Sequence, residues 1–189
     1  MERLTILVVN NHGQFNHLIH RAIRDMGQRS LLTPNTLTTD EVLAQQPNGL
    51  ILGGGPDMSR QGNCGIYMRE LDLPTLGICL GHQAMALTFG GEVRTGRMGG
   101  YANVDVEVLQ PDRILAGFPP TVSVWASHAD EVSCVPGEFD VLARSEICEV
   151  EAMRHRRRPL FGVQWHPEVS HTEGGLKVFK NFLDVCRDV

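Results

Sequence analysis

Hydrophobic residues along the first half of the chain fall into short runs separated by amphipathic segments. Runs rich in β-branched residues predict buried parallel strands over 4–9, 28–32, 49–52 and 74–78. Apolar residues at helical spacing predict intervening helices over 15–26, from Thr39 toward Pro47, over 63–71 and over 82–89. This alternation implies a parallel sheet with helices on its faces.

After residue 90 the pattern changes to closely spaced strand signals that include hairpins. Strands are predicted over 93–95, 103–109, 122–125, 141–143, 148–153 and 160–165, and apolar residues from Leu176 to Cys186 mark one face of a final helix. No repeat, low-complexity tract or linker divides the sequence. We therefore expect residues 1–189 to form one α/β domain, with an open, mostly parallel central sheet flanked by helices and a small antiparallel β elaboration.

Composition and charge narrow the range of functions. The chain is 42% hydrophobic and 21% charged, enough for a packed core. Its net charge of −5 disfavours a nucleic-acid partner. No apolar run approaches the roughly 18 residues that a membrane helix needs, and the N-terminal run is too short for a signal peptide. We expect a cytoplasmic protein without a membrane segment.

The five cysteines are scattered and contain no Cys-x-x-Cys pair, which suits neither a disulfide framework nor a zinc cluster. One of them has a distinctive setting. Cys79 directly follows the predicted strand 74–78 and precedes a predicted helix, with Gly77 and Gly81 on either side. Such a strand-to-helix turn resembles a nucleophile elbow, and the helix N-terminus favours the thiolate. The alternative is a buried structural cysteine, which is how we interpret the other four.

A histidine and a carboxylate follow the last predicted strand. In an extended segment, residues two apart point to the same side, so His166 and Glu168 of the His-Pro-Glu sequence can lie together. A carboxylate on one imidazole nitrogen leaves the other free to exchange a proton with a thiol. Because ligands bind at the carboxyl edge of open α/β sheets, Cys79, His166 and Glu168 form a candidate catalytic set.

The glycines at 53–55 end another predicted strand and can turn main-chain N–H groups toward a developing oxyanion. The N–H of Leu80, directly after the thiol, is the natural second donor. No Gly-Lys-Ser/Thr sequence follows the glycines, so a nucleotide P-loop is disfavoured. A plain strand-ending turn is the alternative.

Three further groups have two interpretations each. His17 and His20 are three apart on a helix, yet no further metal ligand accompanies them, and we predict no metal site. The basic run Arg154–Arg158 is either a solvated hairpin tip, which we favour, or a docking site for a partner. His128 and Asp130 could form a second dyad, although we expect His128 to serve the substrate or a contact with a partner.

Taken in order, Gly-Gly-Gly-Pro at 53–56, Gly-Ile-Cys-Leu-Gly-His-Gln at 77–83 and His-Pro-Glu at 166–168 resemble the motifs of class I (triad-type) glutamine amidotransferases. Further segments, 13–21, 125–132, 148–153 and 164–172, look like the separate glutaminase subunit of archaeal-type, two-subunit GMP synthase. The resemblance covers essentially the whole chain and implies a flavodoxin-like sheet within a single type-1 amidotransferase domain.

By this resemblance, Cys79 attacks the side-chain amide of L-glutamine, His166 transfers the protons and Glu168 orients His166. The N–H groups of Gly55 and Leu80 would hold the oxyanion. Substrate contacts are implied for four further residues: Gln83, His128, Ala129 and Gly100. The segment Gly99-Gly100-Tyr101 departs from the Glu-Phe/Tyr-Gly of many relatives, which leaves the contacts there open.

The resemblance also implies a partner. Ammonia would pass to a separate ATP-pyrophosphatase subunit that converts XMP to GMP, and that subunit would carry ATP and Mg²⁺, with no cofactor on this chain. Low glutaminase activity without the partner is then expected. The alternatives are an amidotransferase subunit for another acceptor, of the anthranilate or aminodeoxychorismate type, a free-standing γ-glutamyl hydrolase, or a regulatory module without turnover.

Overall fold

Five parallel strands form the half of the sheet that the first part of the sequence predicts. The computed structural model describes residues 3–189, apart from the side chains of 97–101. The parallel strands are adjacent in the order β2-β1-β3-β4-β9. Their bounds are β2 Arg29–Pro34, β1 Thr5–Asn10, β3 Gly49–Leu52, β4 Thr75–Ile78 and β9 Leu160–Val163. The predicted fold class is therefore confirmed.

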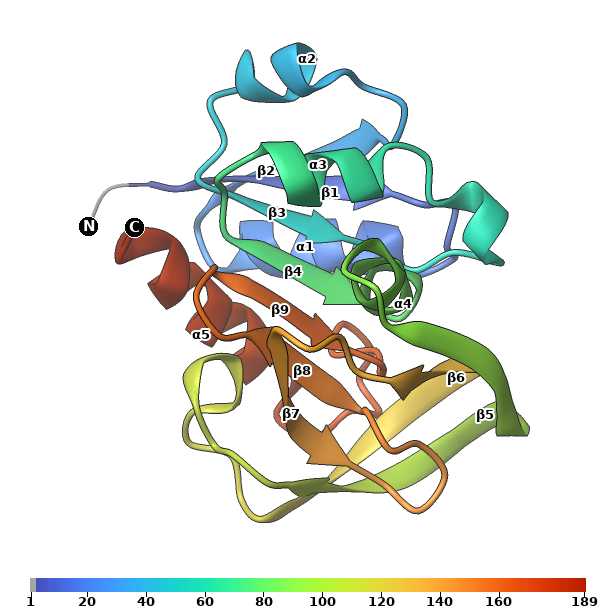
Figure 1. Cartoon of the computed structure of the whole chain (residues 1–189). Coiled ribbons are helices and arrows are strands. Elements are labelled where there is room, and N and C mark those ends of the chain that lie inside the picture. Colours follow the sequence, from blue (N-terminus) through green and yellow to red (C-terminus); the bar gives the residue numbers. More distant parts are fainter. Residues whose placement is uncertain (1–2) are drawn as a thin grey trace.

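The antiparallel half continues the same sheet beyond β9. Its strands follow in the order β8-β7-β5-β6, with bounds β8 Ala152–His155, β7 Phe139–Arg144, β5 Glu92–Val108 and β6 Thr121–Cys134. β5 and β6 form the long curved hairpin drawn in green and yellow in Figure 1.

Three predicted strand limits were wrong in this half. The expected strands 93–95 and 103–109 are one strand, β5, because a register shift between Thr95 and Gly100 carries the pairing with β6 across the intervening glycines. β6 likewise runs on to Cys134 instead of ending at 125. The predicted strand 148–153 begins only at Ala152, because Ser145 Oγ accepts the N–H groups of Ile147 and Cys148 and forms a turn there.

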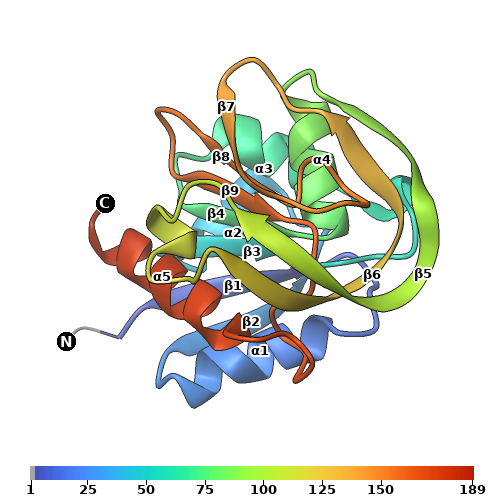
Figure 2. The same ribbon diagram turned by 90° about the horizontal axis from the view of Figure 1, so that it is seen from below.

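Helices cover both faces of the sheet (Figures 1 and 2). One face carries α1 (Asn16–Asp25) and α5 (Gly175–Arg187), and the other carries α2 (Thr39–Leu43), α3 (Cys64–Glu70) and α4 (Leu80–Thr88). Short 3₁₀ turns lie at Met58–Arg60 and Arg113–Leu115.

Residues 6–9 of β1 are all apolar, without the alternation of apolar and polar residues that a strand exposed on one face shows. Ile6 and Val8 belong to the core against α1 and α5, whereas Leu7 and Val9 belong to the core against α3 and α4. All four side chains are buried. Because both faces of the strand are covered, successive side chains all need to be apolar.

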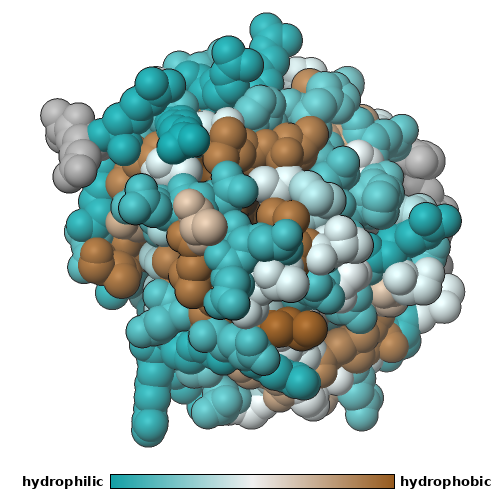
Figure 3. Space-filling model, turned by 90° about the horizontal axis from the view of Figure 1, so that it is seen from above, coloured by the Kyte–Doolittle hydropathy of each residue, from teal (hydrophilic) through white to brown (hydrophobic). Residues whose placement is uncertain are grey.

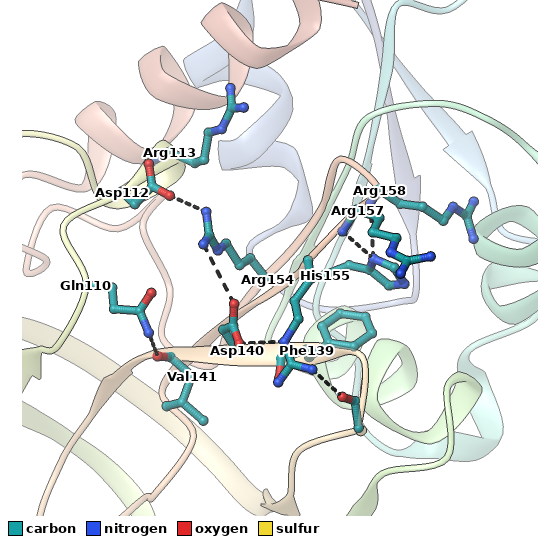
Figure 4. A network of polar contacts seen from close by, with 12 residues as sticks. Gln110, Asp112, Arg113, Phe139, Asp140, Val141, Arg154, His155, Arg157 and Arg158 are labelled. Carbon is teal, nitrogen blue, oxygen red and sulfur yellow. Dashed lines mark hydrogen bonds and ion pairs between the residues drawn. The ribbon is translucent and has the colours of Figure 1, made fainter.

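The basic run Arg154–Arg158 is held mainly by contacts within the chain (Figure 4). Arg154 pairs with Asp112 and lies 3.7 Å from Asp140, which also accepts a 2.8 Å hydrogen bond from Arg156. Arg158 donates to the carbonyl of Leu71 and lies over the ring of Phe89. These contacts favour the hairpin-tip interpretation over a docking site.

Two observations describe the surface. Figure 3 shows hydrophilic side chains separating several hydrophobic areas on the face seen from above. Among the described residues, no helix combines the length and the hydrophobicity that crossing a bilayer requires.

Gly77 is needed where β4 meets α4. A Cβ atom on Gly77 would lie 2.5 Å from the carbonyl oxygen of Gly81 and 2.7 Å from the nitrogen of His82, both main-chain atoms of the helix. We expect Gly77→Ala to lower the free energy of unfolding by about 1–3 kcal/mol, measured by urea denaturation. Gly137→Ala is the control, because no atom lies within 4 Å of a Cβ there. Equal stabilities of the two variants would contradict the prediction.

Candidate active site

Four neighbouring strand ends converge at the carboxyl edge of the sheet. β1, β3, β4 and β9 are consecutive in the strand order, and each is followed by residues that line one cavity or support it. The cavity has a volume of about 470 Å³. Its lining comes from residues 12–16, 54–57 and 127–130, together with Cys79, Leu80, Gln83 and His166. The sheet topology thus brings together segments that lie far apart in the sequence.

Cys79 lies at a strained turn between β4 and α4. Its φ and ψ are 53° and −105°, a conformation that glycine adopts more readily than other residues. The turn is fixed because Cys79 N–H donates to Val163 O at 2.9 Å and Gln83 N–H donates to Cys79 O at 3.0 Å. The helix begins at Leu80, ahead of the predicted start at His82, because the sharp turn at Cys79 ends the strand and caps the helix at once.

His166 is held between the thiol and a carboxylate. Its Nδ1 donates to Glu168 Oε1 at 2.7 Å, and the interaction of the ring with Cys79 helps to raise the pKa of His166. The Glu168 side chain is fully buried, so the interaction is shielded from water. The structure therefore brings all three predicted catalytic residues together.

The main chain and the ring of His166 are also fixed by neighbours. The N–H of His166 donates to Trp125 O at 3.1 Å, and its carbonyl accepts from Thr172 Oγ1 at 2.6 Å. The ring of Phe15 packs edge-on against the imidazole, with centroids 5.2 Å apart. The imidazole consequently has little freedom to rotate away from the thiol.

The charge balance around His166 favours imidazolium. Burial alone would lower the pKa of His166, but hydrogen bonds and negative charge from Cys79 and Glu168 outweigh it and raise the pKa to about 10. A raised pKa means that His166 keeps its proton through neutral pH. An imidazolium beside a cysteine favours the thiolate, which is the nucleophilic form of the side chain.

The expected oxyanion donors lie beside the thiol. Gly55 and Leu80 both line the cavity. A Cβ on Gly54 would lie 3.3 Å from His166 Cε1 and 3.8 Å from Cys79 Cβ, so this loop passes directly over the reacting groups. The N–H of Leu80 is at the first turn of α4, where no intrahelical acceptor is available. This arrangement can stabilise a negative charge that forms next to Cys79.

The remaining predicted site residues divide into three cases. Gln83, His128 and Ala129 line the cavity. His128 Nδ1 bonds to the main-chain oxygen of Asp130 at 2.9 Å, so the structure forms no His128–Asp130 carboxylate dyad. Gly100 lies in 97–101, outside the residues described in full, and its contact with substrate stays a prediction. Among the described residues, no group of three potential metal ligands is found.

Sequence reasoning assigned no role to the cavity wall formed by residues 12–16. A Cβ on Gly13 would lie 2.4 Å from Gly54 O, so this wall packs closely against the glycine loop. Asn16 is buried and donates to Gly54 O at 3.1 Å. The sequence did contain a signal for this wall. The segment follows a predicted parallel strand, and the candidate catalytic residues also follow parallel strands, so all of them are expected at the same edge of the sheet.

The fold and this site define the class of protein. A family model for glutamine amidotransferase class-I matches residues 7–186. The chain therefore belongs to the class I glutamine amidotransferase family.

Relatives within the family carry a more particular name. The chain is 60% identical over 186 residues to a protein of Methanosarcina barkeri that is named as one subunit of glutamine-hydrolyzing GMP synthase, and the match covers 98% of each chain. It is 50% identical over 184 residues to the protein of the same name from Archaeoglobus fulgidus, covering 97% of this chain and all of that one.

Solved structures agree with the fold. A crystal structure of a provisionally named GMP synthase subunit from Thermoplasma acidophilum has a TM-score of 0.94 and 34% sequence identity, covering all of this chain and 96% of that one. A glutamine amidotransferase from Thermotoga maritima has a TM-score of 0.74 at 19% identity, covering all of this chain and 84% of that one, which shows the fold alone.

The raised pKa of His166 predicts how Glu168→Gln changes the reactivity of Cys79. Removing the carboxylate charge lowers the pKa of His166, so the ring loses its proton at a lower pH and supports less thiolate. At neutral pH we therefore expect iodoacetamide to alkylate Cys79 more slowly in Glu168→Gln than in the wild type. Peptide mass spectrometry measures the rate, with exposed Cys134 as the internal control. An unchanged rate at Cys79 would contradict the prediction.

Proposed function

We propose that this chain is the glutaminase subunit of a two-subunit GMP synthase. It hydrolyses L-glutamine to glutamate and ammonia, and a separate ATP-pyrophosphatase subunit uses the ammonia to convert XMP to GMP. The observation that carries the proposal is that Cys79 and His166 line one cavity, with His166 hydrogen-bonded to Glu168, beside main-chain donors at the end of a parallel sheet. The identity over nearly the full chain to proteins named as one subunit of glutamine-hydrolyzing GMP synthase supports this particular amidotransferase.

Two half-reactions follow from the site. The Cys79 thiolate attacks the side-chain amide carbon of glutamine, and the N–H groups of Gly55 and Leu80 hold the resulting oxyanion. The C–N bond breaks as the His166 imidazolium gives its proton to the leaving ammonia, and a γ-glutamyl thioester remains on the sulfur. His166, now neutral, takes a proton from water, which attacks the thioester and releases glutamate.

Glu168 takes no proton in this scheme. Its carboxylate fixes which imidazole nitrogen carries the hydrogen toward it and stabilises the positive charge that returns to the ring in each half-reaction. The 2.7 Å hydrogen bond and the complete burial of the carboxylate support this orienting role.

The remaining expectations concern the partner and the compartment. We place ATP and Mg²⁺ on the ATP-pyrophosphatase subunit and no cofactor on this chain. We also place the protein in the cytoplasm, which is consistent with its five cysteines being free.

The decisive test combines the chain with an archaeal ATP-pyrophosphatase subunit, XMP, ATP and Mg²⁺. We expect Cys79→Ala to lower glutamine-dependent GMP formation by at least about 10³-fold, because the covalent route is lost. Added ammonium should still support GMP formation, measured by chromatography of the nucleotides. Loss of both activities in a folded complex would contradict the assignment.

The same assay separates the alternatives. Rapid glutamine hydrolysis by the isolated chain, or turnover only with a chorismate-using partner, would favour a γ-glutamyl hydrolase or an amidotransferase for another acceptor. Absence of a stoichiometric adduct between Cys79 and a glutamine analogue would favour a module without turnover.

A further inference from the structure

Gln164 lies behind the site and belongs to no catalytic step described so far. It directly follows β9 and precedes His166 by two positions. Its side chain is completely buried, and its main-chain N–H donates to Glu151 O at 2.7 Å. Gln164 is not among the described residues that line the cavity. Gln83, to which it is hydrogen-bonded, does line the cavity.

The side-chain amide nitrogen of Gln83 has both of its hydrogens occupied. Nε2 donates to the main-chain oxygen of Asp130 at 2.7 Å and to Gln164 Oε1 at 3.3 Å. Both partners are acceptors, so turning the amide over would set its oxygen against two other oxygens. Within the described part of the chain, Gln83 Oε1 is therefore the atom of this amide left to accept a hydrogen bond from a ligand.

The amide at position 164 is poorly suited to a purely packing role. Its Nε2 is buried and has no hydrogen-bond partner among the described residues. A buried donor without a partner costs free energy that an apolar side chain of similar size would avoid. The part of Gln164 that makes a specific contact is Oε1, and that contact is with Gln83.

We infer that Gln164 is a positioning residue for substrate binding, which acts by holding Gln83 with Oε1 turned toward the cavity. There Oε1 accepts a hydrogen bond from an N–H donor of the bound substrate, which is glutamine under the proposed function on which this inference rests. β9 and the residues after it thus supply both the base, His166, and the support of a substrate contact.

Substituting methionine at 164 tests this role, because methionine keeps the length and volume but lacks the acceptor. In the complex with the partner subunit, we expect Gln164→Met to raise the KM for glutamine about tenfold and to change kcat less than about twofold. The melting temperature should not fall. A lower melting temperature with an unchanged KM would overturn the inference in favour of a packing role.

A rescue variant and a double variant make the test specific. Gln164→Glu keeps an acceptor oxygen in the same place, so its KM should stay within about threefold of wild type. Gln83→Met and the double variant Gln83→Met/Gln164→Met should share one KM, because Gln164 acts through Gln83. A KM for Gln164→Glu as high as for Gln164→Met, or a double-variant KM equal to the product of the two single effects, would overturn the inference.

A measurement without turnover separates this inference from the proposed function. In ¹H–¹⁵N spectra of the chain, the two side-chain amide hydrogens of Gln83 should exchange slowly in the wild type and markedly faster in Gln164→Met. Unchanged exchange would overturn the positioning role even if glutamine is hydrolysed. Failure of the wild type to hydrolyse glutamine with its partner, combined with faster exchange in the variant, would overturn only the proposed function.

Discussion

Parallel pairing of β4 with β3 on one side and β9 on the other is the constraint on which the site depends. Register fixes Gly77 opposite Gly162 and Leu52 opposite Gly77, so the three strands end at the same edge. The residues after each strand carry a different chemical group: the glycine loop follows β3, the thiol follows β4 and the imidazole follows β9. These groups need no loop of unusual length to meet, because strand adjacency already brings them together.

The second requirement is a balance of buried charge. His166 interacts with both Cys79 and Glu168, and its raised pKa means that it carries a positive charge beside the fully buried side chain of Glu168. Each group alone would resist burial, because a buried charge without a partner is strongly destabilising. Together they form a unit in which Trp125 O and Thr172 Oγ1 hold the main chain of His166. Reactivity of the sulfur is therefore set by the whole unit and not by the cysteine alone.

The sequence predicted the parallel half well because its strands are apolar on both faces and its turns carry glycine, as at Gly77 and Gly81. It predicted the triad because Cys79 directly follows one strand, and His166 and Glu168 come a few residues after another. The prediction of strand limits failed where pairing with a distant strand sets those limits. β5 continues across a glycine-rich stretch because it pairs with β6 there. The wall at 12–16 and the support from Gln164 were missed because burial and amide orientation depend on neighbours distant in the sequence.

The backbone angles of Cys79 have a consequence for the molecule as a whole. Holding a side chain other than hydrogen at a φ of 53° and a ψ of −105° costs of order 1–3 kcal/mol, which the surrounding strands and α4 must offset. Glycine at this position would relax the turn. Selection for stability alone would therefore favour glycine over cysteine here. The working protein is therefore less stable than its own inert counterpart, and the difference lies in a single pair of torsions.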